Sequence, residues 1–127
     1  MVKYFSPEFF SQLQDSLATD AKWQEATKAL KTSVKLTSTG QGNASTYLLK
    51  VEDGKTSISP SEAAAQAEFS FEGAYETWTK VAKGEVDFQS AVLKGVLRFK
   101  GSITKILVYK DRFLRIAEVM RSIAVEF

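Results

Sequence analysis

The fold of this chain is decided by residues 71–101, "FEGAYETWTKVAKGEVDFQSAVLKGVLRFKG". Gly84 follows one amphipathic segment, and glycine readily adopts the positive φ that ends a helix. The acidic residues of 85–87 then suit the first turn of a second helix. Gly95 ends that segment and leads into an alternating stretch that closes at Gly101. We therefore predict helices over 73–82 and 85–93, followed by a strand over 95–101.

Downstream of this stretch the apolar residues recur at helical spacing. Ser102 can cap a helix in "SITKILVYK", and "DRFLRIAEVMRSIAVEF" continues the same periodicity. The sequence therefore predicts a closing pair of helices. Their apolar faces comprise Ile103, Ile106, Leu107, Phe113, Ile116, Ala117, Met120 and Ile123.

Upstream, the pattern changes from helix to sheet. Ser6 as N-cap and Pro7 at the first helical position open an amphipathic segment, "SPEFFSQLQDSL", and "TDAKWQEATKAL" starts a second helix or continues the first. Alternation in "SVKLTSTG", "ASTYLLKVEDG" and "KTSIS" then predicts three strands, with turns at 40–43 and 53–54 and a stop at Pro60. "AEFSFEG" alternates again, with Phe69 and Phe71 facing inward. We expect the connector "SPSEAAAQA" to be helical.

This order predicts one domain, 1–127, of the α+β class. We expect a five-stranded, mostly antiparallel sheet covered on one face by helices. The helices offer more apolar surface than five short strands can cover. Either the helices pack in two layers or they enclose a space.

The composition excludes much familiar chemistry. The chain of 127 residues has no Cys and no His, so Ser-His and Cys-His nucleophiles and the commonest metal sites cannot be built from it. We predict no enzymatic activity and no cofactor, although an enzyme that uses carboxylates or Tyr stays open. The first residues lack the pattern of a signal peptide and no apolar run is long enough to cross a membrane, so we expect a cytoplasmic protein.

Charge is unevenly distributed, although the net charge is only +2. Residues 94–127 carry eight Lys or Arg against three Asp or Glu, which is +5. This balance does not indicate a nucleic-acid binder. A basic C-terminal third can favour transient contact with an anionic membrane surface, or it is simply the solvated face of amphipathic helices.

The element order and the run from Phe71 onward resemble the sterol carrier protein 2 (SCP-2) family. Gly84 and Asp87 match the step between two helices in that family, and Ala91 matches an alanine of the second helix. Gly95, Leu97 and Gly101 match the strand that follows, which lies between two glycines. The resemblance is good over residues 67–110 and holds by pattern only before that.

The resemblance implies a carrier of lipids or other long apolar molecules, held in a hydrophobic tunnel between the sheet and the helices. The chain looks like a free-standing prokaryotic or archaeal version of the family. For such a version the resemblance supports an apolar ligand better than it supports sterol itself.

Two sets of residues are candidates for the walls of that tunnel. Each of them can equally be ordinary core. The set from the middle helices is Tyr75, Trp78, Val81, Phe88 and Val92, and the set from the closing helices is Ile103, Ile106, Leu107, Phe113, Ile116 and Met120.

The charged residues near these walls can have either a structural role or a functional one. Arg98 can reach a ligand carboxylate, but an ion pair with Glu68 or Glu72 is the simpler expectation. Glu68, Glu72 and Glu76 are more typical of a solvated face than of a metal or acid-base site.

The preferred hypothesis is thus non-catalytic binding or transfer of a fatty-acyl, isoprenoid or sterol-like molecule. The alternative is an interaction domain, in which the same apolar face pairs two copies or docks on an enzyme partner without a small ligand.

Overall fold

The central sheet starts as an antiparallel meander. In the computed structural model, which describes residues 1–40, 45–62 and 64–127, β2 (Lys31–Thr39), β3 (Ser45–Glu52) and β4 (Lys55–Ser61) pair in chain order. This confirms the three predicted strands. Of the turn expected at 40–43, only Gly40 is among the described residues.

The sheet is mixed because β5 (Phe69–Ala74) pairs in parallel with β2, while β6 (Arg98–Lys100) runs antiparallel to β5. The strand order is β4-β3-β2-β5-β6. The α+β class and the mostly antiparallel five-stranded sheet are confirmed. The parallel β2–β5 pair has no signal in the local pattern, because register depends on partners far apart in sequence.

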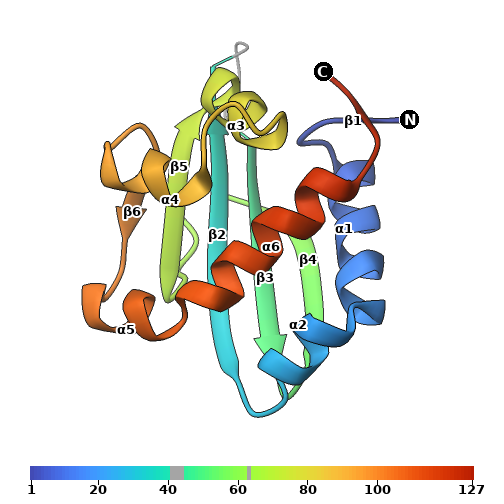
Figure 1. The fold of residues 1–127 in the computed structure, drawn as a ribbon, viewed down its shortest axis with the longest axis vertical. Coiled ribbons are helices and arrows are strands. Elements are labelled where there is room, and N and C mark those ends of the chain that lie inside the picture. The colour runs from blue at the N-terminus through green and yellow to red at the C-terminus, as the bar shows by residue number, and fades with distance from the viewer. Residues whose placement is uncertain (41–44, 63) are drawn as a thin grey trace.

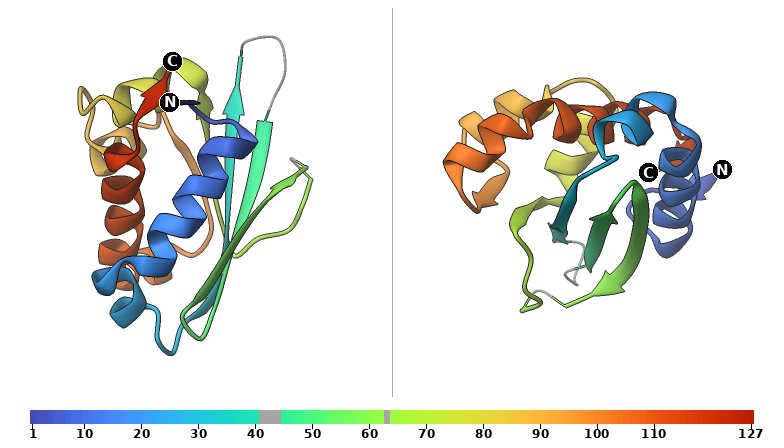
Figure 2. Two further views of the ribbon diagram at one scale, coloured as in Figure 1. Left: turned by 90° about the vertical axis from the view of Figure 1, so that its right-hand side faces the viewer. Right: turned by 90° about the horizontal axis from the view of Figure 1, so that it is seen from below.

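Helices cover one face of the sheet, as expected (Figures 1 and 2). α6 crosses this face diagonally, and no helix of the described residues lies on the other face. The six helices of the described residues are α1 (Pro7–Thr19), α2 (Ala21–Ala26), α3 (Tyr75–Ala82), α4 (Phe88–Leu93), α5 (Ile103–Val108) and α6 (Lys110–Ser122).

Capping side chains set several helix boundaries. Ser6, Asp20 and Ser102 each accept a hydrogen bond from the backbone N–H three residues on, so they begin α1, α2 and α5. Asp87 caps α4 in the same way, and α4 therefore starts at Phe88 and not at the expected residue 85.

Three further expectations need correction. The connector after β4 is not helical in its described residues; Lys35 of β2 donates to the Ala65 carbonyl at 3.1 Å. β4 continues through Pro60, which is tolerated because β4 is an edge strand. The strand expected over 95–101 is limited to Arg98–Lys100.

The two ends of the chain lie together, which the sequence pattern did not indicate. β1 (Val2–Lys3) and β7 (Val125–Glu126) form a short parallel pair. This pair places Tyr4 beside the start of α3, where it becomes part of the core. Figure 1 shows both termini at the same end of the molecule.

Candidate functional site

A small apolar cavity lies between the sheet and the helices, with a volume of about 20 Å³. Its walls are formed by β2, β3 and β5 on one side and by α3, α4 and α6 on the other. Such a volume exceeds the space of a single water only slightly, and a cavity with apolar walls of this kind stays dry. Its lining is Tyr4, Val34, Leu36, Leu49, Phe71, Trp78, Val81, Ala82, Phe88, Phe113, Ile116, Ala117, Met120 and Arg121.

A second apolar space, the outer cleft, opens between α4 and the α5–α6 pair and measures about 120 Å³. A larger hollow on the surface, about 430 Å³ over the β3–β4 turn, is lined largely by charged and hydroxyl side chains. It does not suit an apolar guest. The outer cleft is lined by Phe88, Gln89, Val92, Leu93, Ile106, Leu107, Lys110, Phe113 and Leu114.

Phe88 and Phe113 line both spaces and therefore form the partition between them. Both rings make edge contacts with Phe71 of β5, at centroid distances of 5.1 and 5.5 Å. Phe113 is buried, whereas Phe88 at the start of α4 is only half-buried. Of the two rings, Phe88 is the less constrained.

The end of the cavity at α3 is fixed by two hydrogen bonds. The Trp78 indole Nε1 donates to the Thr37 carbonyl of β2 at 2.9 Å, and the Tyr4 hydroxyl donates to the Trp78 carbonyl at 3.0 Å. Burial raises the pKa of Tyr4, which keeps its hydroxyl protonated as a donor. Both aromatic side chains are thus buried with their polar atoms paired.

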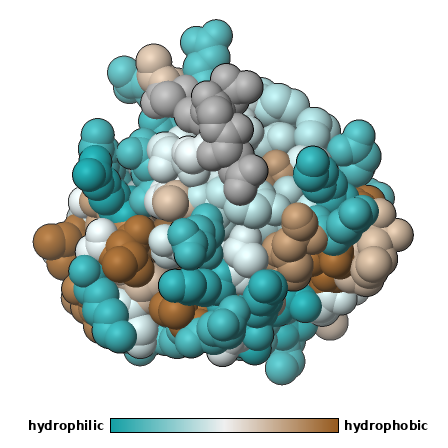
Figure 3. Space-filling view, turned by 90° about the horizontal axis from the view of Figure 1, so that it is seen from above, coloured by the Kyte–Doolittle hydropathy of each residue, from teal (hydrophilic) through white to brown (hydrophobic). Residues whose placement is uncertain are grey.

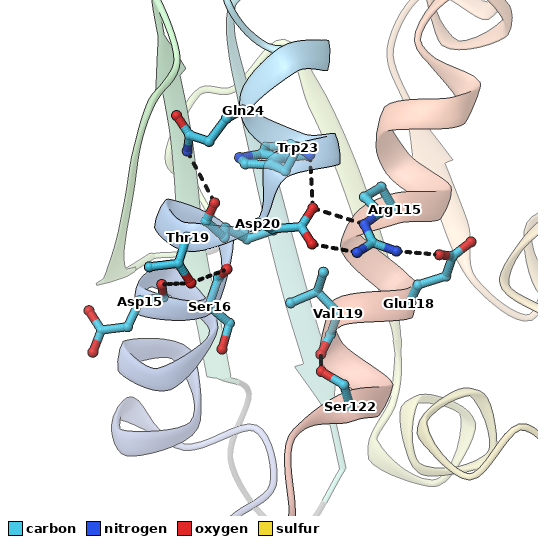
Figure 4. A network of polar contacts seen from close by, with 11 residues as sticks. Asp15, Ser16, Thr19, Asp20, Trp23, Gln24, Arg115, Glu118, Val119 and Ser122 are labelled. Atoms are coloured by element: carbon cyan, nitrogen blue, oxygen red, sulfur yellow. Dashed lines mark hydrogen bonds and ion pairs between the residues drawn. The ribbon is translucent and has the colours of Figure 1, made fainter.

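α6 is tied to the α1–α2 junction by the network of Figure 4. Arg115 donates from Nε to Asp20 at 2.9 Å and from Nη2 to the other carboxylate oxygen, and it also donates to Glu118 at 2.7 Å. Asp20 meanwhile accepts from the Trp23 backbone N–H at 2.8 Å. These hydrogen bonds, that from Arg115 first, lower the pKa of the Asp20 carboxyl. The network positions the helix that forms one wall of the cavity.

Most of the predicted wall residues lie at one or other of the two spaces. Those at the inner cavity alone are Trp78, Val81, Ile116 and Met120; those at the outer cleft alone are Val92, Ile106 and Leu107; Phe88 and Phe113 touch both. Tyr75 lines neither, and its ring lies 5.9 Å from that of Tyr4. Ile103 also lines neither and is 72% exposed.

Sequence reasoning missed the contribution of the sheet to the cavity. Val34, Leu36, Leu49 and Phe71 lie on alternating strands, but the sequence does not show which inward residues border a space. No pattern in the sequence indicated that Tyr4 or Arg121 would line the cavity. The guanidinium of Arg121 lies so close to Gly84 that a Cβ there would be 2.5 Å from Nη2.

Polar residues near the site have structural partners. Glu68 accepts from Thr32 and from Lys105, the latter at 2.9 Å, and these hydrogen bonds lower the pKa of Glu68. The ion-pair partner of Glu68 is thus Lys105 and not the expected Arg98. Within the described residues, no cluster of acidic side chains can hold a metal ion, and no helix has the length and hydropathy to cross a membrane.

Comparison with solved structures identifies the same arrangement elsewhere. A crystal structure of sterol carrier protein 2 superposes with a TM-score of 0.86 at 21% identity, over 96% of this chain and 100% of the other. A conserved hypothetical protein from Thermus thermophilus, described as possibly a sterol carrier protein, gives 0.83 at 21% identity, over 99% and 93%. A ubiquinone synthesis protein, UbiJ-SCP2, gives 0.58 at 15% identity, over 87% and 85%. At these low sequence identities, the similarity shows a shared fold and nothing more.

The family follows from the sequence itself. No curated protein matches the chain. The model of the SCP-2 sterol transfer family, however, matches residues 10–113, which span the whole sheet and reach the Phe113 of the partition. The chain belongs to the SCP-2 sterol transfer family.

Proposed function

We propose that this protein binds and transfers a lipid-like molecule, held between the sheet and α3, α4 and α6 without covalent chemistry. Membership of a sterol transfer family supports lipid binding in general. The carbon-rich lining of both spaces supports an apolar guest, such as a fatty-acyl, isoprenoid or sterol-like chain.

The observation that carries the proposal is the shared partition. Because Phe88 and Phe113 border both spaces, rotation of the less constrained Phe88 ring would join cleft and cavity into one passage. That passage would correspond to the tunnel expected from the sequence. It would run from the gap between α4 and α5 to Trp78.

The cavity must expand to accept such a ligand. A pocket for a drug-sized molecule measures about 300 Å³ or more, far above the 20 Å³ between sheet and helices. The elements best able to move are those with least buried surface. α5 has no buried side chain and α4 buries only Ala91, whereas α6 buries four side chains. We infer that α4 and α5 move away from α6 as the ligand enters.

Affinity would come from apolar burial, at about 25 cal/mol per Å². Part of it is lost in immobilising the ligand and in opening the α4–α5 region. This cost favours flexible chains that can fill the space progressively.

The first test is native mass spectrometry of protein purified without detergent, followed by organic extraction. A co-purifying apolar molecule, or uptake of added acyl chains or isoprenoids, is the expected result. Protein that stays empty with every such compound contradicts the proposal. The alternative interaction domain would instead show a mass that depends on protein concentration and not on lipid.

The two tryptophans provide a matched spectroscopic control. Trp78 lines the cavity and Trp23, equally buried, does not. In a Trp23→Phe variant the emission of Trp78 should respond to ligand. In a Trp78→Phe variant the emission of Trp23 should stay constant while mass spectrometry still detects the complex.

A further inference from the structure

Large apolar side chains are exposed around the mouth of the outer cleft. On α5, Ile103, Leu107 and Val108 are 72%, 69% and 66% exposed, and Leu93 at the end of α4 is 79% exposed. Leu93 and Leu107 lie at the cleft itself, and Ile103 is one helical turn before Leu107. We call these four residues the apolar rim. Exposed apolar patches of this kind mark interaction surfaces.

The apolar rim lies in the most basic part of the chain. Residues 88–112 contain six Lys or Arg and one Asp, which is +5, although the whole chain carries only +2. Lys94 follows Leu93, Lys110 lines the cleft, and Arg98 and Lys100 are exposed on β6 between α4 and α5. Figure 1 shows α4, β6 and α5 at one side of the molecule. In Figure 3, apolar side chains lie among hydrophilic ones at that side.

We propose that the apolar rim and its lysines dock on a bilayer surface that carries anionic lipids. The inference rests on the proposed function, which it extends by naming the surface from which the ligand is exchanged. Apolar side chains would insert below the head groups while the cations remain among the phosphates.

Charge complementarity favours this occupant over a second copy of the chain. Lys105 in this segment is paired with Glu68, which leaves +4, and a two-fold dimer through the rim would bring the two positive segments against each other. Continuity with the site also favours a bilayer. Docking through Leu93 and Leu107 directs the mouth of the outer cleft toward the acyl chains, so a ligand would pass between bilayer and protein without crossing water.

The charge contribution is tested with two matched triple variants in a flotation assay. The vesicles contain equal parts phosphatidylglycerol and phosphatidylcholine. Replacing Lys94, Lys100 and Lys110 with Gln should weaken partition roughly a hundred-fold, about five-fold for each lysine. The control replaces Lys3, Lys22 and Lys55, which are exposed on other elements, and loses the same charge. Equal weakening by the two triples overturns the proposal, because net charge alone would then explain binding.

Insertion of the rim is tested with a single environment-sensitive dye, since the chain has no Cys of its own. Dye attached to Ile103→Cys should shift to the blue when these vesicles are added. Dye attached to Ser11→Cys, an exposed position on α1, should not. A shift at residue 11 alone, or self-association that Ile103→Ser abolishes, overturns the proposal.

The two proposals fail differently. Ligand uptake in mass spectrometry without any vesicle binding removes the docking inference and leaves the carrier function intact. Vesicle binding with protein that never takes up an apolar molecule removes the carrier function. It leaves the rim as a surface for membranes alone.

Discussion

Phe88→Ala tests whether the partition controls passage between the outer cleft and the inner cavity. A buried Phe→Ala change costs about 3–5 kcal/mol. Phe88 is half-buried, so we expect a loss of about 2 kcal/mol, or roughly 8 °C in Tm for a chain of this length. The variant should therefore remain folded, and its ligand exchange can be measured.

The effect on exchange follows from the contacts that the ring must leave. Full burial of a Phe side chain contributes about 1.5–3 kcal/mol, so the buried half of Phe88 adds about 1.1 kcal/mol to the barrier. Removing the ring should speed ligand dissociation about sixfold. Stopped-flow displacement of a fluorescent polyene fatty acid measures this rate, and urea unfolding measures the stability.

Phe99→Ala is the matched control. Phe99 is also half-buried and its ring lies 5.3 Å from that of Phe71, as the Phe88 ring lies 5.1 Å from it, but Phe99 lines neither space. It should lose similar stability and leave the exchange rate unchanged. Equal acceleration in both variants would refute the partition, because general loosening of the core would then explain it.

Three further predictions concern stability, each measured by urea unfolding. Asp20→Ala should cost about 1 kcal/mol more than Asp20→Asn at neutral pH, because Asn retains the helix cap. The folded pKa of Asp20 lies below the unfolded value of about 3.9, so its bond with Arg115 stabilises above that pH and is lost as the pH falls through the folded pKa. Asp20→Asn should remove this acid dependence. Tyr4→Phe should cost about 1–2 kcal/mol, since the Trp78 carbonyl loses its donor. The pKa of Tyr4 is raised by burial, so its contribution is complete below about pH 10 and falls at higher pH; the variant should lose that alkaline dependence. Gly73→Ala should cost about 1–3 kcal/mol, because its Cβ would lie 2.5 Å from a buried leucine side chain.

Each of these has a clear contrary result. If Asp20→Asn loses stability at acid pH just as the wild type does, the bond with Arg115 does not stabilise the fold. Wild-type stability of Tyr4→Phe would show that water replaces the hydroxyl. Unaltered stability of Gly73→Ala would show that the β5 backbone can move away from that leucine.

The sequence by itself determined most of the longer helices and strands and the α+β class. Local signals are enough for this: Ser6 with Pro7 begins a helix, Gly84 ends one, and alternation at Phe69 and Phe71 marks a strand. It also supported the family, because the spacing of Gly84, Asp87, Gly95 and Gly101 encodes successive caps and turns. Such features depend on residues within a few positions of each other.

Only the tertiary structure decided which candidate residues line the cavity, which line the cleft and which line neither. The helical spacing predicts that both Ile103 and Ile106 belong to the apolar face of their helix. Because α5 lies at the edge of the helical layer, Ile106 lines the cleft whereas Ile103 faces outward. Tyr4 entered the core only because the chain ends pair. Burial and register depend on which elements meet across the fold, and that information is not local.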